Sequence, residues 1–179
     1  MKTWCTTFGI LLLSLLASCA SNPGYRVSKT PPPDKHGMTS YRKGQTLRLV
    51  RTTAYSCAEN EPGAFGKLTS MGTRLTYGNR VRTAAADWSR YPAGTHFKIK
   101  GLPYTYVVED YGRALVGTNT IDLYHPNLWL MKKWGTRNVQ IEIIKWGDPR
   151  YSIERLKGRA ERFDHCKQMY NDLVTRKFL

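Results

Sequence analysis

The sequence is short of acidic side chains and contains no compact run of basic ones. Asp and Glu total 13 against 28 Lys and Arg, which gives a formal net charge of +15. An excess of positive charge on this scale usually indicates a nucleic-acid partner. Here the basic residues are dispersed along the chain, which is the pattern expected for attraction to a diffuse polyanion or an anionic lipid surface. The charge alone therefore does not predict nucleic-acid binding.

The histidines are too widely spaced to predict a metal site. The four histidines have neither helical nor turn spacing; they are His36, His96, His125 and His165. Aspartates could bind a hard cation, but no segment resembles an oxygen-rich calcium loop. We predict neither a metal nor another cofactor.

The only strongly apolar run is at the N-terminus. Residues 1–18 carry one Lys and then FGILLLSLLA, which is typical of an export signal and is too short to span a membrane. The residues Leu16-Ala17-Ser18-Cys19 resemble a lipobox, which implies cleavage before Cys19 and lipidation of that cysteine. The alternative is an ordinary signal peptide cut at a small-residue site. Ala20 follows the cysteine in place of Asp, which suggests the periplasmic face of the outer membrane in a cell with two membranes.

Export changes the interpretation of both charge and cysteines. Without residues 1–18 and their single Lys, the net charge is 15 − 1 = +14. An exported basic protein meets peptidoglycan, whose stem peptides carry carboxylates, so this polymer replaces nucleic acid as the predicted partner. Cys5 leaves with the signal and Cys19 is lipidated, so Cys57 and Cys166 remain for a disulfide. Such a bond would stabilise the fold by about 3 to 4 kcal/mol. The alternative is two buried thiols.

Short alternating segments predict a mainly β domain over residues 45–147. Residues 19–44 contain SNPG and PPPDKHG and indicate an extended tether after the lipidated Cys19. Turn signals then separate six β-type runs: TLRLVRTTAY, VRTAAAD, THFKIK, TYVVED, NTIDLY and VQIEIIKW. Six short strands without long helical segments between them favour a small closed barrel over a βαβ sheet.

Residues 148–179 change to a helical period. Apolar side chains recur at three- and four-residue spacing, namely Ile153, Leu156, Ala160, Phe163, Tyr170, Leu173 and Val174. Gly158 would cost this helix about 1 kcal/mol relative to Ala. We predict one C-terminal amphipathic helix that packs over an end of the barrel.

Three aspartates stand at or near the ends of predicted strands. Asp122 lies between Ile121 and Leu123, so two core-facing neighbours would turn its carboxylate to the outer face. Asp110 ends its strand, and Asp87 follows Ala86 in the same way. Any one of these carboxylates is more commonly a turn former or a salt-bridge partner, but together they indicate a site.

The segments that carry these acids resemble the three-Asp (3D) domain family, which includes the barrel domain of membrane-bound lytic transglycosylase A. The matching segments span about residues 50 to 146 and are TAYS, AAADWSRYPAGTHFKI, VVEDYGRALVG, TIDLYH and WGTRNVQIEII. The resemblance implies a six-stranded double-psi β-barrel. It also implies cleavage of the β-1,4 bond between N-acetylmuramic acid and N-acetylglucosamine, with formation of a 1,6-anhydro ring. By position Asp122 matches the catalytic acid, Asp110 the second groove aspartate and Asp87 the first.

A lytic transglycosylase needs only one catalytic carboxyl group, whereas a hydrolysing glycosidase needs two. The substrate's own C6 hydroxyl is the nucleophile, so Asp122 can protonate the leaving oxygen and then accept the hydroxyl proton. It must start protonated although the usual pKa of Asp is about 3.9. Negative charge on Asp110 and burial beside Tyr124 would both favour the proton.

The chain departs from the family pattern at several positions. Arg113 stands where the family has Gly, Val116 where it has Lys, and Trp88 where it has Pro; a guanidinium near Asp122 would oppose acid catalysis. The large second domain that forms the other groove wall in the membrane-bound enzyme is also absent, so that wall would come from the helix, a second copy or nothing. The oligomeric state stays open. The residues expected to contact glycan are Tyr55, Trp88, Tyr111, Gly112, Arg113 and Tyr124.

A second hypothesis is a lipoprotein that binds glycan strands without cutting them, as in the related rare lipoprotein A barrel. A fold cannot separate the two hypotheses. An opposed pair of carboxylates at Asp110 and Asp122 favours the enzyme, because a binder does not need it.

Overall fold

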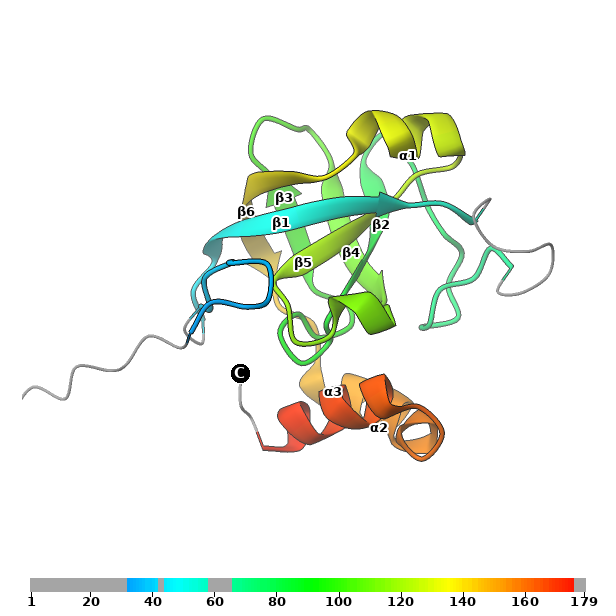
Figure 1. Ribbon diagram of the computed structural model, residues 1–179. Coiled ribbons are helices and arrows are strands. Elements are labelled where there is room, and N and C mark those ends of the chain that lie inside the picture. Colours follow the sequence, from blue (N-terminus) through cyan, green and yellow to red (C-terminus); the bar gives the residue numbers. More distant parts are fainter. Residues whose placement is uncertain (1–31, 42–43, 58–65, 176–179) are drawn as a thin grey trace, which may run out of the picture.

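The chain forms a closed barrel of six strands (Figure 1). The computed structural model describes residues 32–41, 44–57 and 66–175. The strands are β1 (Leu47–Tyr55), β2 (Val81–Ala86), β3 (His96–Ile99), β4 (Thr105–Asp110), β5 (Thr120–Tyr124) and β6 (Arg137–Lys145). The first five lie within the segments predicted from the sequence, and β6 begins two residues before its segment. The mainly β, closed-barrel prediction is confirmed.

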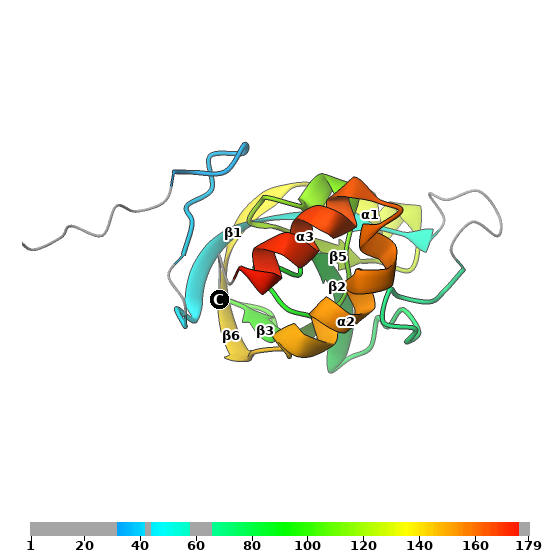
Figure 2. The same cartoon turned by 90° about the horizontal axis from the view of Figure 1, so that it is seen from below.

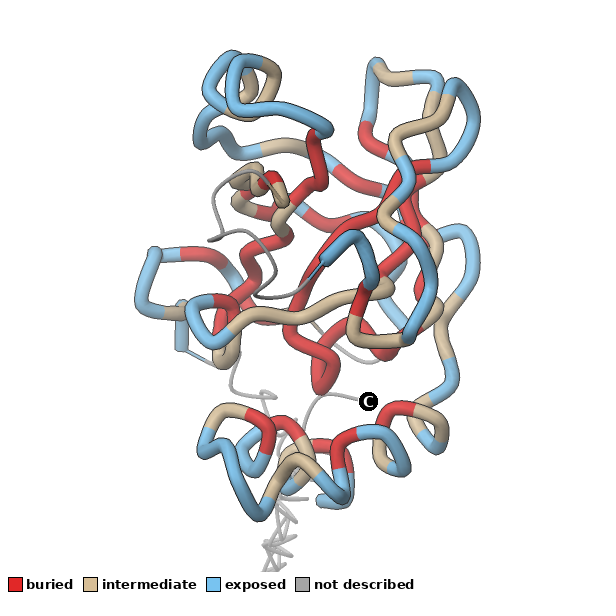
Figure 3. Tube along the Cα trace, turned by 90° about the vertical axis from the view of Figure 1, so that its right-hand side faces the viewer, coloured by how far each residue is buried: buried red, intermediate tan, exposed pale blue. Residues whose placement is uncertain are grey.

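Strands that are distant in sequence lie side by side in the barrel. The order around it is β1-β5-β2-β4-β3-β6. The pairs β1–β5 and β2–β4 are parallel, and the other four pairs are antiparallel. Alternation sends one face of each strand inward, so Val50, Ile121 and Leu123 are fully buried in a shared core. Figure 3 shows these buried segments running through the barrel.

Two helices, not one, follow the barrel. They are α2 (Pro149–Ala160) and α3 (Asp164–Val174), and they lie together beneath it (Figures 1 and 2). The prediction of one continuous helix was wrong because Phe163 has an extended backbone with φ −134° and ψ 118°. The side chains of Leu156 and Met169 are buried and belong to the same core cluster as the strand residues.

A third helix, α1 (Leu128–Trp134), was not predicted. Asn127 caps it by accepting a hydrogen bond from the Leu130 amide. None of its residues is buried. Its sequence LWLMKKW is apolar at five of seven positions, but seven residues are too few to show a helical period. No helix in the described part of the chain is long and apolar enough to cross a membrane.

The predicted tether is partly wrong, because residues 32–41 pack on the barrel. The Asp34 carboxylate accepts hydrogen bonds from the His36 and Met38 amides and from the Asn119 amide at the start of β5. The Met38 side chain is buried. A local turn built on Asp34 therefore docks this segment beside Asn119. Residues 1–31, including the predicted signal and Cys19, lie outside the described residues.

The predicted disulfide is not formed. Cys57 and Cys166 are free thiols that contact different tyrosines. The Cys57 sulfur lies 3.8 Å from the Tyr124 hydroxyl, and the buried Cys166 thiol donates to the Tyr111 hydroxyl at 3.4 Å. The alternative of two buried thiols holds only for Cys166, because Cys57 is half-buried.

Candidate functional site

Asp110 and Asp122 lie on one face of the barrel wall, separated by a single small residue. In the strand register, Ala85 of β2 is opposite Asp122 of β5 on one side and opposite Asp110 of β4 on the other. Residues opposite one another in paired strands point to the same face, so both carboxylates flank the Ala85 methyl group. Two strand spacings place their Cα atoms about 10 Å apart. The expected outward direction of Asp122 is confirmed, because Ile121 and Leu123 are fully buried and Asp122 is not.

A β-bulge puts Asp110 on this face. The register between β2 and β4 shifts by one residue between Ala84 and Ala85, so Ala84 pairs with Val108 and Ala85 pairs with Asp110. Without the shift, strand alternation would give Asp110 the same inward direction as the fully buried Val108. The extra residue, Glu109, binds the hydroxyls of Thr73 and Thr83 through its carboxylate. The acid pair therefore depends on the bulge.

Asp110 is held by donors on one of its two oxygens. Its Oδ1 accepts hydrogen bonds from the Ser70 amide at 3.2 Å, the Ser70 hydroxyl at 2.5 Å and the Tyr111 amide at 2.9 Å. All hydrogen bonds that the Asp110 carboxylate accepts from the described residues go to Oδ1, which leaves Oδ2 for a ligand. Burial raises the pKa of Asp110, although these donors and the charge of Arg159 act in the opposite direction.

Asp122 is oriented by its register partner. Thr53 lies opposite it on β1, and the Thr53 hydroxyl donates to Asp122 Oδ1 at 2.7 Å. Thr53, Asp122, Ala85 and Asp110 thus form a row across four adjacent strands. Because the row lies on hydrogen-bonded strands, the barrel itself fixes the spacing of the acids.

The Tyr55 hydroxyl lies near both acids and is buried without a hydrogen-bond partner among the described residues. Burial raises its pKa first, and the negative charges of Asp110 and Asp122 raise it further. The hydroxyl therefore keeps its proton and is available as a donor. A buried polar group left unpaired costs about 1 to 3 kcal/mol, and such groups often mark sites that bind a ligand. The predicted role of Tyr55 in ligand contact stays a prediction, since its hydroxyl has almost no exposed surface in this structure.

Asp87 does not belong to this face, so its predicted place in a groove is wrong. Its side chain is 0% exposed. One oxygen accepts from the amide and hydroxyl of Ser89, and the other accepts from the Gly117 amide at 2.7 Å. Arg90 lies 3.8 Å from the second oxygen. Burial raises the pKa of Asp87, and the hydrogen bonds and Arg90 oppose the rise. Asp87 ties two loops together.

Two of the residues predicted to contact glycan, Trp88 and Tyr124, are buried. Trp88 is 0% exposed and belongs to the core, so it offers no stacking surface. Its indole N–H donates to the Asp110 carbonyl at 3.0 Å, and its ring packs edge-on against Tyr111 at 4.9 Å between centroids. Tyr124 is buried, and burial followed by the contact with Cys57 raises its pKa to about 12. Trp88 therefore supports Asp110 from below the surface, whereas Tyr124 packs against Tyr55 with ring centroids 5.7 Å apart.

The segment after Asp110 places the substituted arginine at the surface. Gly112 precedes the 3₁₀ helix η2 (Arg113–Leu115), in which Arg113 is exposed. Its charge acts on His165, whose pKa is lowered first by burial and then by Arg113. The cation that acts on Asp110 is instead Arg159 of α2. Sequence patterns do not single out Arg159 or Ser70, whereas Thr53 falls within the TAYS segment and a strand-register argument could have found it.

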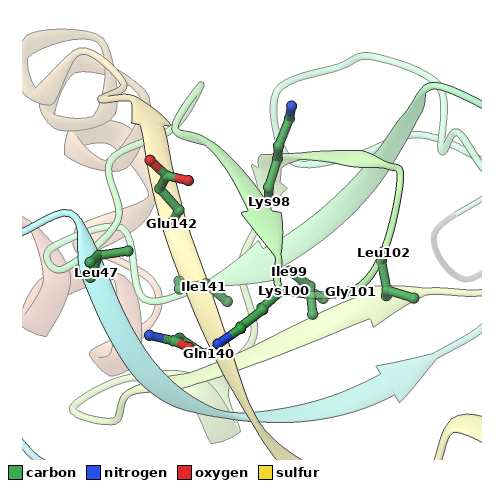
Figure 4. A pocket seen from close by; sticks show the side chains of 9 residues that line it. All are labelled: Leu47, Lys98, Ile99, Lys100, Gly101, Leu102, Gln140, Ile141 and Glu142. Atoms are coloured by element: carbon green, nitrogen blue, oxygen red, sulfur yellow. The ribbon is translucent and has the colours of Figure 1, made fainter.

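A shallow hollow of about 390 Å³ lies elsewhere on the barrel, over β1, β3 and β6 (Figure 4). Lys98 and Glu142, which are opposite one another in the register, stand at its edge. None of the predicted site residues lines it. Within the described ranges, no group of three or more His, Cys, Asp or Glu side chains could hold a metal ion. No protein-family model matches the chain, and no curated protein matches it.

Proposed function

We propose that the chain is a lytic transglycosylase of peptidoglycan, and that Asp122 is its catalytic residue. The observation that carries this proposal is the row in which Asp110 and Asp122 flank Ala85 on one face. Membership of the three-Asp domain family and a double-psi topology belong to the same proposal. Two parallel strand pairs within an otherwise antiparallel closed barrel support that topology.

In the proposed reaction, the carboxyl group of Asp122 donates its proton to the oxygen that leaves with N-acetylglucosamine. The bond from that oxygen to C1 of N-acetylmuramic acid breaks, and the C6 hydroxyl of the same sugar bonds to C1. Asp122 then takes the hydroxyl proton and is restored to its starting state, so no water is consumed. An ionised Asp110 on the same face favours the proton on Asp122.

Other groups of the site supply orientation. The Thr53 hydroxyl donates to the Asp122 carboxyl group and fixes its orientation. The net charge of +15 favours a polymer that carries carboxylates. In this proposal the chain is exported and is held by lipid at Cys19 on the periplasmic face of the outer membrane.

Digestion of murein sacculi tests the proposal. The purified full-length protein should release muropeptides that end in 1,6-anhydro-muramic acid, detected by chromatography and mass spectrometry. Asp122→Asn should reduce the rate by about 10²- to 10⁴-fold, since it removes the group that transfers the proton. Glu142→Gln, which removes an exposed carboxylate at the edge of the distant hollow, is the control and should digest normally.

The products distinguish the alternatives. Muramic acid with a free reducing end would mean hydrolysis and would contradict a mechanism that uses one carboxyl group. Sacculi that bind the protein but stay intact would contradict the enzyme and favour the glycan-binding lipoprotein.

A further inference from the structure

Arg159 connects the helix pair to the acid site through two hydrogen bonds. It is partly buried on α2, and its Nη1 donates to the Tyr111 hydroxyl at 2.9 Å. Its Nη2 donates to the Ser70 carbonyl oxygen at 3.3 Å. A guanidinium group is planar and presents several donors at fixed angles, so a single arginine can hold two acceptors in a defined relation.

The two residues held by Arg159 are the same two that donate to Asp110. Ser70 binds Asp110 Oδ1 through its amide and hydroxyl, and Tyr111 binds the same oxygen through its amide. Ser70 belongs to the loop before β2 and Tyr111 follows β4. The loop is joined to β4 where the Met71 amide donates to the Glu109 carbonyl at 3.2 Å, and Arg159 adds a contact to both Ser70 and Tyr111.

The neighbouring arginine on α2 offers a contrast. Arg155, one turn earlier, donates to the Met71 carbonyl at 2.8 Å and to the Tyr151 hydroxyl at 2.9 Å. It therefore contacts the same loop, one residue further along. Within the described part of the chain, Arg155 makes no hydrogen bond to Ser70 or Tyr111, and it is exposed. A comparison of Arg155 with Arg159 variants therefore distinguishes two effects. Loss of Arg155 removes a contact between the helix and the loop, whereas loss of Arg159 removes contacts with the residues that bind Asp110.

We propose that Arg159 is a positioning residue for the acid site, by which the C-terminal helix pair holds Ser70 and Tyr111 against Asp110. The helices lie outside the barrel, yet they complete the surroundings of one of its carboxylates. The catalytic consequence of this role rests on the proposed function, whereas its effect on Asp110 does not.

The role has an electrostatic side. The groups that face Asp110 are the Ser70 loop, Tyr111, the Arg159 guanidinium from α2, the Tyr55 hydroxyl from β1 and Asp122 from β5. Burial disfavours the charge of Asp110, while the donors and Arg159 favour it. Loss of Arg159 removes the cation and loosens the donors, so Asp110 would take up a proton at higher pH. It would then no longer favour the proton on Asp122.

The test compares full-length wild type with Arg159→Gln, Arg159→Lys and Arg155→Gln. The pKa of Asp110 is measured by carbon-13 NMR of its carboxyl group during a pH titration. It should rise in Arg159→Gln and stay at the wild-type value in Arg155→Gln. Arg159→Lys keeps the charge but cannot bind both acceptors in the same fork, so its pKa should lie between the two.

Sacculus digestion across pH gives the catalytic readout. The acid limb of the rate profile should move to higher pH in Arg159→Gln, with a rate loss of about 10- to 100-fold that reflects misplacement of the site. Arg155→Gln should keep the wild-type profile. If Arg159→Gln does not fold, Arg159→Lys carries both measurements.

The two proposals fail in different ways. A wild type that leaves sacculi intact would refute the proposed function, and the NMR titration would still test Arg159. An Asp110 pKa and a rate profile that stay at wild-type values in both Arg159 variants would overturn the positioning role.

Discussion

Replacement of Asp87 by Ala would show whether this buried carboxylate serves the fold or the chemistry. The sequence pattern grouped Asp87 with Asp110 and Asp122, but the structure buries it completely. The substitution removes the acceptors for the amide and hydroxyl of Ser89 and for the Gly117 amide. We expect a less stable protein that still cuts glycan when it is folded.

The size of the effect follows from the donors left behind. Two backbone N–H groups, those of Ser89 and Gly117, lose their acceptor, and each such loss costs about 1 to 3 kcal/mol. The sum is about 2 to 6 kcal/mol. Burial raises the pKa of Asp87, so removing the carboxylate also relieves a desolvation cost. We therefore expect the lower part of the range, about 2 to 4 kcal/mol, which lowers Tm by about 4 to 16 °C.

Urea unfolding and thermal unfolding measure the stability loss, and sacculus digestion at low temperature measures function. The digestion is performed well below the Tm of the variant, so that the folded fraction is complete. Asp110→Asn is the matched comparison, because it should lose digestion without a comparable loss of Tm. An Asp87→Ala protein with wild-type Tm and no digestion would refute the reasoning, since Asp87 would then act on the substrate.

Two further predictions concern ionisation and the thiols. Burial raises the folded-state pKa of Asp110 above its unfolded value, so ionisation of Asp110 costs stability at neutral pH. Asp110→Asn should therefore raise Tm at pH 7. The gain in Tm should vanish below about pH 4, where the acid is protonated in both states. A Tm at pH 7 below wild type would contradict this. Alkylation without reductant in denaturant, followed by peptide mass spectrometry, should label both Cys57 and Cys166, whereas buried Cys166 should react slowly in the native protein. A linked peptide pair would show that the disulfide forms.

The alternation of side chains along a strand predicts which residues face outward wherever the strand is regular. Ile121 and Leu123 identified the outer face of β5, and with it the direction of Asp122, because a strand has a strict period of two. The same rule fails for Asp110, which depends on a bulge between β2 and β4 that has no signature in β4 alone. Asp122 could therefore be placed from its own strand, whereas Asp110 could be placed only once the bulge was known.

Contacts between distant segments explain the other differences. Trp88 looked like a sugar-binding aromatic, but its burial depends on the helix pair, since the sulfur of Met169 accepts from the Trp88 amide. The break between α2 and α3 follows from the extended backbone of Phe163 in a segment whose apolar period continues through it. Arg159 could not be chosen among 28 basic residues, because its partners lie 48 and 89 positions away.

The strand order also determines when β1 can pair during folding. Both neighbours of β1 in the barrel, β5 and β6, come after all three of β2, β3 and β4 in the chain. Tyr55 ends β1 and Thr120 begins β5, so 120 − 55 = 65 positions separate them. Such long-range pairing slows folding and leaves an open edge on β1 until β5 and β6 have joined it.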